Sequence, residues 1–195
     1  MGVPQDSNPF SGTQILLGVT GGIAAYKAAA LTSSLAQAGA QVTVLMTPAA
    51  AHFVTPLTFQ ALSGRPTYTS PWEHIESQDP QHIALAESAD AAVVAPCTMD
   101  TLARLAVGRT DDVVTLALSA VDRTRTPVLL APSMNAVMWG QPSTQRNLET
   151  LRGDGFGFIG PDDGWQACRT LGTGRMAEPS AIFDELAERL IAAKT

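Results

Sequence analysis

Short apolar segments alternate with helix-forming segments along this chain, and this alternation restricts the fold more than any other feature of the sequence. Most of the apolar segments are built of Val, Leu, Ile and Ala with few polar interruptions. We expect strands at 14–20, 41–46, 91–95, 126–131 and 155–159. We expect helices at 24–38, 56–62, 80–88, 99–106, 112–120, 143–151 and 181–193.

The apolar character of the strands also indicates how the sheet is covered. A strand that is apolar on both faces is typical of a parallel sheet enclosed between two helix layers. Strands that alternate with helices indicate the same arrangement. The sequence therefore predicts the α/β class: a doubly wound, mainly parallel sheet with helices on both faces, which is a three-layer fold of the Rossmann or flavodoxin-like type.

The length of 195 residues fits one domain with a substantial core. Residues 1–13 are polar and contain Pro and Gly, so we expect a flexible N-terminal tail there and a single domain over 14–195. Within that domain, the Gly-dense stretch at about 160–178 predicts a mobile flap.

Charge and apolar content exclude several classes of protein. The net charge is −6 and Lys and Arg are not clustered, which argues against a nucleic-acid binder. No apolar run approaches the roughly 20 residues that cross a bilayer, and residues 1–11 lack a signal pattern, so we expect a cytoplasmic protein. The two Cys and three His do not lie at metal-ligand spacing, so we expect no metal.

The first predicted strand leads into Gly21 and Gly22 and then into a helix. In a doubly wound sheet, ligands bind beyond the carboxyl ends of the strands, and a helix N-terminus there offers free N–H groups to a phosphate. The spacing is not G-x-G-x-x-G, and Thr47 follows the second strand where an NAD-binding chain has an acidic residue. A mononucleotide is favoured over NAD; the alternative is a tight turn without a ligand.

The strand at 91–95 also ends beside polar side chains, namely Thr98, Asp100 and Thr101. Hydroxyls next to a helix N-terminus can hold a phosphate or a ribose. Capping of the helix by Thr98 or Asp100 explains the same residues equally well. Because a carboxylate repels phosphate, we expect Asp100 to cap the helix or to contact a ribityl chain.

The segment 132–139 places Asn135 among two Met and a Trp directly after an apolar strand. A buried amide costs free energy unless it is paired, and its planar donors and acceptor suit a carboxylate or an amide ligand. We expect Met134, Met138 and Trp139 to form an apolar wall beside it. The alternative is a loop Asn next to core side chains.

Two further residues are candidates for proton transfer. His82 begins a predicted helix near the carboxyl edge of the sheet, and an imidazole there can act as a general base, although a surface His is the commoner case. Cys168 lies in the predicted flap, where Arg169 and Arg175 are expected to lower its pKa or to bind an anionic substrate. Cys97 adjoins a buried strand and is expected to be core.

Two patterns in the chain together resemble the homo-oligomeric flavin-containing cysteine decarboxylases. P-x-M-N-x-x-M-W spans residues 132–139 and is specific to that family. A-C-x-x-x-G-x-G-x-M spans residues 167–176 and marks the branch that serves coenzyme A synthesis. The resemblance extends from Ile15 to about Pro179, and it implies FMN-dependent decarboxylation of 4'-phosphopantothenoylcysteine to 4'-phosphopantetheine.

The resemblance also implies a role for each candidate residue. The residues implied to bind FMN are Gly21, Gly22, Ile23, Ala24, Thr47, Thr98, Asp100 and Thr101. His82 corresponds to the active-site His, Asn135 to the Asn that holds the substrate carboxylate, and Cys168 to the reductive Cys. Met138 and Arg175 are expected to bind the substrate together with Asn135.

The resemblance further implies a homotrimer or a dodecamer with the flavin site between subunits. The chain ends at Thr195, so a separate phosphopantothenate–cysteine ligase is expected to supply the substrate. Arg169 stands where family members commonly have Gly. The alternatives are a peptidyl-cysteine oxidative decarboxylase that stops at the ene-thiol, a flavin prenyltransferase, and a non-catalytic regulatory flavoprotein. The Cys168 flap argues against the first, the P-x-M-N-x-x-M-W pattern against the second, and the presence of His82, Asn135 and Cys168 together against the third.

Overall fold

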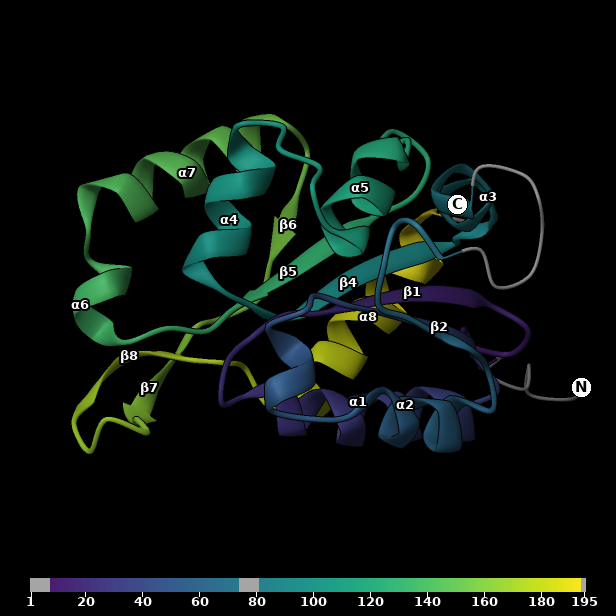
Figure 1. The fold of residues 1–195 in the computed structure, drawn as a ribbon, viewed down its shortest axis with the longest axis horizontal. Coiled ribbons are helices and arrows are strands. Elements are labelled where there is room, and N and C mark those ends of the chain that lie inside the picture. The colour runs from purple at the N-terminus through teal and green to yellow at the C-terminus, as the bar shows by residue number, and fades with distance from the viewer. Residues whose placement is uncertain (1–7, 74–80, 194–195) are drawn as a thin grey trace, which may run out of the picture.

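The computed structural model describes residues 8–73 and 81–193, which form a sheet between two layers of helices (Figure 1). Six strands form the sheet in the order β3-β2-β1-β4-β5-β6, and every neighbouring pair is parallel. The strands are β1 Gln14–Val19, β2 Gln41–Met46, β3 Thr67–Tyr68, β4 Ala91–Cys97, β5 Val128–Pro132 and β6 Gly157–Phe158. The predicted doubly wound α/β fold is confirmed.

Helices cover both faces of the sheet (Figure 1). They are α1 Ala25–Gln37, α2 Pro56–Ser63, α3 Gln81–Ser88, α4 Met99–Ala106, α5 Val113–Ala120, α6 Ala136–Trp139, α7 Pro142–Gly153 and α8 Pro179–Ala193, with a short 3-10 turn η1 at Ala50–His52. Helices α1, α2 and α8 lie on one face, and α3, α4, α5 and α7 lie on the other.

Two hydrophobic cores result, one on each face of the sheet. Side chains alternate along β1, so Ile15 and Leu17 enter the core under α1 and α8, while Leu16 enters the core under α4 and α5. All three are at most 2 % exposed. Burial on both faces is the physical reason that the strands are apolar at consecutive positions.

The strand order reverses between β1 and β4. Because β2 and β3 lie beyond β1 while β5 and β6 lie beyond β4, the connections that leave these two central strands run to opposite sides. Such a reversal opens a crevice at the carboxyl ends of the strands, where doubly wound proteins bind ligands.

A separate antiparallel hairpin is formed by β7 Asp162–Trp165 and β8 Leu171–Arg175. It lies beside α6 at the carboxyl end of the sheet (Figure 1). The backbone N–H of Met134 donates to the carbonyl of Gly174 at 2.9 Å, which ties β8 to the segment after β5. The stretch predicted as a flap over 160–178 therefore has its own two-stranded structure, and Met176 at its end is buried in the core.

The N-terminal tail predicted over 1–13 divides into two parts. Residues 1–7 lie outside the described residues, as does Pro80 at the start of the helix predicted over 80–88. Residues 8–13 form hydrogen-bonded turns, and the Phe10 ring lies 4.4 Å from the ring of Phe183 on α8. Phe10 is 1 % exposed, so the packed fold begins before β1.

Among the helices of the described ranges, none has both the length and the apolar character that a membrane span requires.

Candidate active site

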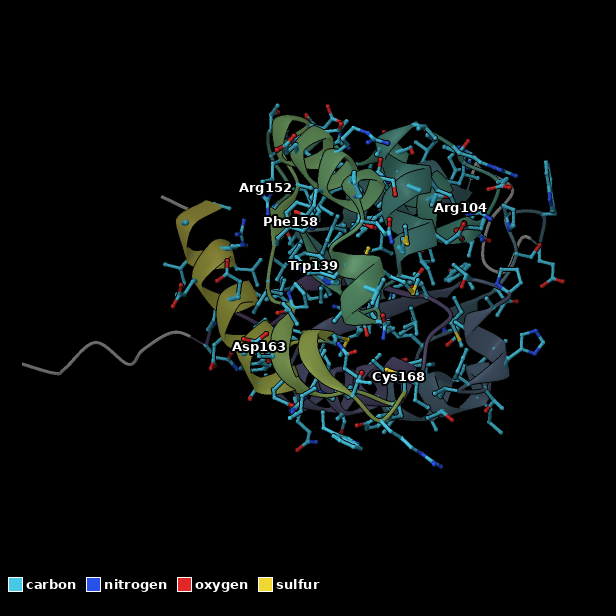
Figure 2. All side chains as sticks on the ribbon, turned by 90° about the vertical axis from the view of Figure 1, so that its left-hand side faces the viewer. Arg104, Trp139, Arg152, Phe158, Asp163 and Cys168 are labelled. Carbon is cyan, nitrogen blue, oxygen red and sulfur yellow. The ribbon has the colours of Figure 1, made fainter. Side chains whose placement is uncertain are left out.

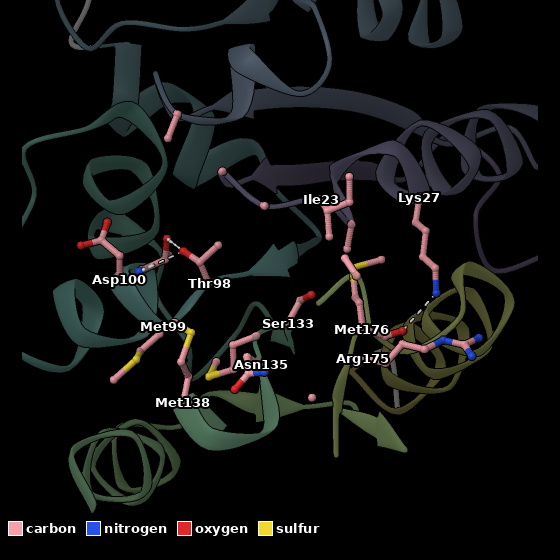
Figure 3. Close-up of a pocket in the computed structure, with 18 of the residues that line it drawn as sticks. Ile23, Lys27, Thr98, Met99, Asp100, Ser133, Asn135, Met138, Arg175 and Met176 are labelled. Carbon is pink, nitrogen blue, oxygen red and sulfur yellow. Dashed lines mark hydrogen bonds between the residues drawn. The ribbon is translucent and has the colours of Figure 1, made fainter. Parts of the chain in front are cut away.

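A cavity of about 1160 Å³ opens at the carboxyl ends of β1, β2, β4 and β5, where the strand order reverses (Figure 3). Small-ligand sites typically measure about 300–1,000 Å³, so this cavity is large enough for a small-molecule ligand. The implied FMN-binding and substrate-binding residues all line it: Gly21, Gly22, Ile23, Ala24, Thr47, Thr98, Asp100, Thr101, Asn135, Met138, Cys168 and Arg175.

The first turn of α1 forms one wall of the cavity, and it has no side-chain cap. Its N-cap is Ala24, whose side chain cannot accept a hydrogen bond. The Ala25 and Lys27 N–H groups donate to the Gly22 and Ala24 carbonyls at 2.9 Å, so the attraction of this helix start for an anion such as a phosphate comes from the helix dipole and from the remaining N–H groups. This end of the cavity therefore fits the phosphate of a mononucleotide.

The two glycines before α1 differ in what requires them. A Cβ on Gly21 would lie 2.4 Å from the Cβ of Ala49, so only glycine allows this turn to pack against the segment after β2. A Cβ on Gly22 would meet the nearest side chain, Thr98, at an ordinary 3.6 Å. Packing thus explains Gly21, while Gly22 brings the backbone to the cavity wall.

Three threonine hydroxyls meet at the ends of β1 and β4. Thr98 is the N-cap of α4 and accepts from the Thr101 N–H at 3.3 Å, and the two hydroxyl oxygens are 3.1 Å apart. The Thr20 hydroxyl donates to the Pro96 carbonyl at 2.6 Å and accepts from the Thr98 N–H at 3.2 Å. Thr98 therefore caps a helix and also lines the cavity, and Thr20 is a buried residue of this network that the sequence analysis missed.

Asp100 does not cap α4. Its carboxylate accepts from the Arg104 guanidinium at 2.8 Å, and Arg104 also pairs with Asp111. Hydrogen bonding to Asp100 raises the pKa of Arg104. Arg104, Asp100 and Asp111 all line the cavity, so these ion pairs neutralise the Asp100 carboxylate at its wall.

Asn135 is the N-cap of the short helix α6. Its Oδ1 accepts from the Val137 N–H at 2.8 Å, so its Nδ2 points the other way, toward Gln166 and Cys168. Nδ2 donates to the Cys168 Sγ at 3.1 Å and to the Gln166 Oε1 at 3.4 Å. The structure therefore brings together two residues that lie 33 positions apart in the sequence.

Cys168 lies in the turn of the hairpin (Figure 2), and its thiol is exposed. Hydrogen bonds from Thr170, 3.0 Å away, and then from Asn135 lower the pKa of the Cys168 thiol. The predicted cause, the neighbouring arginines, is wrong, because neutral hydrogen-bond donors stabilise the thiolate. Cys97 is buried as predicted, and desolvation raises the pKa of its thiol.

The base of the hairpin is joined to α1 by ion pairs. Glu178 accepts from Lys27 of α1 at 3.0 Å and also pairs with Arg175. Hydrogen bonds from Lys27 and then from Arg175 lower the pKa of Glu178. In the view of Figure 3, Asn135 lies between Thr98 and Asp100 on one side of the cavity and Arg175 on the other.

The apolar wall predicted beside Asn135 is present only in part. Met138 is 41 % exposed and lines the cavity together with Met134. Trp139 is not among the lining residues; it packs against the core on the α4 and α5 face of the sheet (Figure 2).

His82 is not placed beside Asn135 and Cys168 within one chain. It lies on α3, which packs against α5 at the opposite end of the sheet from α6 and the hairpin (Figure 1), and it does not line the cavity. Over the described ranges, no group of three or more His, Cys, Asp or Glu side chains could hold a metal ion.

Comparison with known proteins connects this geometry to a family. The Flavoprotein family matches residues 5–191. The coenzyme A biosynthesis bifunctional protein CoaBC of Haemophilus influenzae is 46% identical over 179 residues, which cover 92% of this chain and 44% of that protein. The chain thus spans less than half the length of this curated relative.

Two solved structures share the fold over almost their whole length. A Cys→Ser mutant of PPC decarboxylase complexed with pantothenoylaminoethenethiol has a TM-score of 0.81 and 32% identity, with 92% of this chain and 98% of that chain covered. The FMN binding protein AtHal3 has a TM-score of 0.79 and 32% identity, with 94% and 98% covered.

Proposed function

Because this chain belongs to the Flavoprotein family, we propose that it binds FMN and decarboxylates 4'-phosphopantothenoylcysteine to 4'-phosphopantetheine in coenzyme A synthesis. The observation that carries the proposal is the 3.1 Å contact between Asn135 Nδ2 and Cys168 Sγ inside a cavity that also contains an uncapped helix N-terminus. This pairs a carboxylate-binding amide with a proton-donating thiol beside a phosphate site. The similarity to PPC decarboxylase and to CoaBC supports the same reaction.

The cavity suits FMN at its α1 end. The first turn of α1 would bind the phosphate, together with the Thr98 and Thr101 hydroxyls and Thr47. Asp100, neutralised by Arg104, would contact the ribityl chain. Bound FMN supplies the two-electron redox chemistry that makes loss of the carboxyl group possible. The structural neighbour described as an FMN binding protein supports this assignment.

Asn135 would hold the carboxylate that is lost. A carboxylate accepts hydrogen bonds only, and bound substrate would take the Asn135 Nδ2 hydrogen that otherwise reaches the Cys168 Sγ, while the Val137 N–H keeps Oδ1 occupied. Fixing the carboxylate fixes the direction of the bond that breaks, which is a matter of orientation. Met138 would contact the apolar part of the substrate, and Arg175 an anionic part.

Cys168 would act in the last step, when the ene-thiol that remains after decarboxylation is reduced to the saturated thiol. The Cys168 Sγ–H would donate the proton to the substrate carbon, the hydride would come from the reduced form of the bound cofactor, and Thr170 and Asn135 would stabilise the thiolate left behind. A Cys168→Ser variant should then release the ene-thiol product.

His82 would be the base that accepts the substrate thiol proton, and we infer that a neighbouring copy of the chain supplies it. The site is incomplete within one chain, because His82 lies away from Asn135 and Cys168. A homotrimer, or a dodecamer built of trimers, would place the α3 of one copy at the cavity of the next. Mixing inactive His82→Asn and Asn135→Asp proteins should restore turnover in hybrid oligomers; hybrids without activity would contradict this arrangement.

The decisive experiment for the reaction is incubation of the FMN-loaded protein with phosphopantothenoylcysteine, followed by mass measurement of the product. Loss of carbon dioxide alone is expected. Loss of carbon dioxide together with two hydrogens would identify an oxidative decarboxylase, and an unchanged substrate mass or failure to bind FMN would contradict the proposal. A separate phosphopantothenate–cysteine ligase as the source of the substrate and a cytoplasmic location stay predictions.

A further inference from the structure

We propose that Gln166 is a positioning residue that holds the Asn135 amide and the Cys168 thiol side by side. Gln166 is 7 % exposed, whereas the turn residues 167–170 that follow it are exposed. A buried amide costs free energy unless its donors and acceptor are paired. The burial of this polar side chain in an exposed turn therefore calls for specific partners.

The Gln166 side chain has partners at both ends of its amide. Its Oε1 accepts from the Ala136 backbone N–H at 3.2 Å, from Asn135 Nδ2 at 3.4 Å, from the Thr170 hydroxyl at 3.5 Å and from the Cys168 thiol at 3.6 Å. Its Nε2 donates to the Gly172 carbonyl at 3.4 Å. Because a backbone N–H can only donate, Ala136 fixes which end of the amide is the oxygen.

The same reasoning fixes the Asn135 amide. The Val137 N–H binds Oδ1, so the two hydrogens of Nδ2 are directed at Gln166 and at the Cys168 Sγ. Without the Gln166 oxygen, one of these hydrogens loses its acceptor and only the Val137 N–H still restrains the amide, so the bond to the thiol is held less firmly. Gln166 also accepts from the Cys168 thiol directly, but a 3.6 Å bond from a weak S–H donor counts for less than the 3.1 Å bond from Asn135, so Gln166 acts on the thiolate mainly through Asn135.

Gln166 also lies at the point where the hairpin meets the segment after β5. A Cβ on Gly174 would be 2.8 Å from Gln166 Nε2 and 2.1 Å from the Met134 carbonyl oxygen, so the amide is packed against β8. Two loops that carry the amide and the thiol are therefore joined by one side chain. The catalytic reason for joining them rests on the proposed function, in which both groups act on one substrate.

The thiol itself offers a test that needs neither substrate nor turnover. Cys97 is buried, so alkylation of the folded full-length protein by iodoacetamide reports on Cys168 alone. The rate at high pH measures access to the thiol, and the midpoint of the pH profile measures how well the thiolate is stabilised. Gln166→Met should move the midpoint upward and slow alkylation at neutral pH by about fivefold, the effect of one lost hydrogen bond, with the high-pH rate unchanged.

A double-mutant cycle separates positioning through Asn135 from a general effect on folding. Asn135→Ala removes the donor, so Gln166→Met should add little to the midpoint shift in that background. Gln37→Met is the matched control, since Gln37 is an exposed amide on α1 that donates to Ser33, and its profile should match that of the unmodified protein. Gln166→Asn is a second variant, to be used if Gln166→Met fails to fold. It keeps the side chain polar but makes it too short to reach the same partners, so it should also move the midpoint upward.

A wild-type midpoint in both Gln166 variants, or additive shifts with Asn135→Ala, would overturn the proposal. Coupled shifts in a protein that fails to decarboxylate would support the positioning role while contradicting the proposed function. If the proposed function holds, the Gln166 variants should also release a larger share of ene-thiol than the unmodified protein.

Discussion

Replacement of Arg169 by Gly tests whether the hairpin turn is strained. Arg169 has φ +66°, and within the described residues it is the one non-glycine residue with a positive φ. A side chain in this left-handed region costs about 1–2 kcal/mol, because its Cβ crowds the following carbonyl oxygen. The Arg169 side chain is exposed, so its removal sacrifices little packing.

Arg169→Gly should change the stability of the turn in two opposite ways. It relieves the backbone strain, which stabilises the turn, and it adds entropy to the unfolded chain, which offsets part of that gain. That entropy costs about 0.5–1 kcal/mol, so the turn should gain about 0.5–1 kcal/mol of stability against opening. Since about 1.4 kcal/mol corresponds to a factor of ten, the opening equilibrium should fall by about two- to fivefold.

Hydrogen exchange of the hairpin peptide measures this opening directly. The amides of Gln166 and Arg169 are bonded within the turn, the first to the Thr170 carbonyl and the second to the Gln166 carbonyl, each at 2.9 Å. Their exchange should slow by about two- to fivefold in Arg169→Gly. Arg169→Ala is the control, because it removes the charge and the long side chain but keeps the Cβ. Equal protection in the Gly and Ala variants, or no gain in Arg169→Gly, would refute the strain argument.

Three further predictions follow from the cavity and its surroundings. Gly21→Ala should lower the free energy of unfolding by about 1–3 kcal/mol and also lower FMN occupancy, because its Cβ would clash with Ala49. Thermal unfolding and the absorbance of bound flavin measure the two effects, and a fully loaded variant of ordinary stability would contradict the packing argument. Asp112→Ala should lower the free energy of unfolding by about 1–2 kcal/mol, because the Asp112 carboxylate caps two amides of α5. Urea unfolding measures this loss, and an unchanged urea midpoint would exclude the capping role. Because the pKa of the Cys168 thiol is lowered, its thiolate persists to lower pH than that of an ordinary cysteine, and the midpoint of its alkylation should lie below the free-thiol value. Cys97 is buried and should react only after unfolding. A Cys168 midpoint at or above the free-thiol value would contradict the hydrogen bonds assigned to its thiol.

The elements that sequence reasoning predicted correctly are those whose burial repeats along the chain. The strand at 41–46 and the helix at 99–106 coincide with β2 and α4, because β2 is a short apolar run buried on both faces and the apolar positions of α4 follow the helical period. Two-residue β3 and four-residue α6 are too short to establish a period, and the sequence analysis did not predict them. The hairpin was expected as a flap, since glycines obscure strand patterning.

In the candidate site, too, some features could be predicted from the sequence and others could not. Asn135 was predictable because a polar residue after an apolar strand must find a partner. Its actual partner, Gln166, depends on the hairpin folding back over a distance of 31 residues, which no local pattern encodes. His82 is a different case, because it lies on α3 away from the cavity, and only the proposed function assigns it to the site of a neighbouring copy.

The cavity walls also have a kinetic consequence. They come from the turn after β1, near the start of the chain, and from the hairpin that precedes α8, near its end. Contacts that close such long loops form late, because their entropy must be lost before the contact can stabilise the fold. The cavity is therefore expected to close after the central strands have assembled. Substitutions in the hairpin should then change the rate of unfolding far more than the rate of folding.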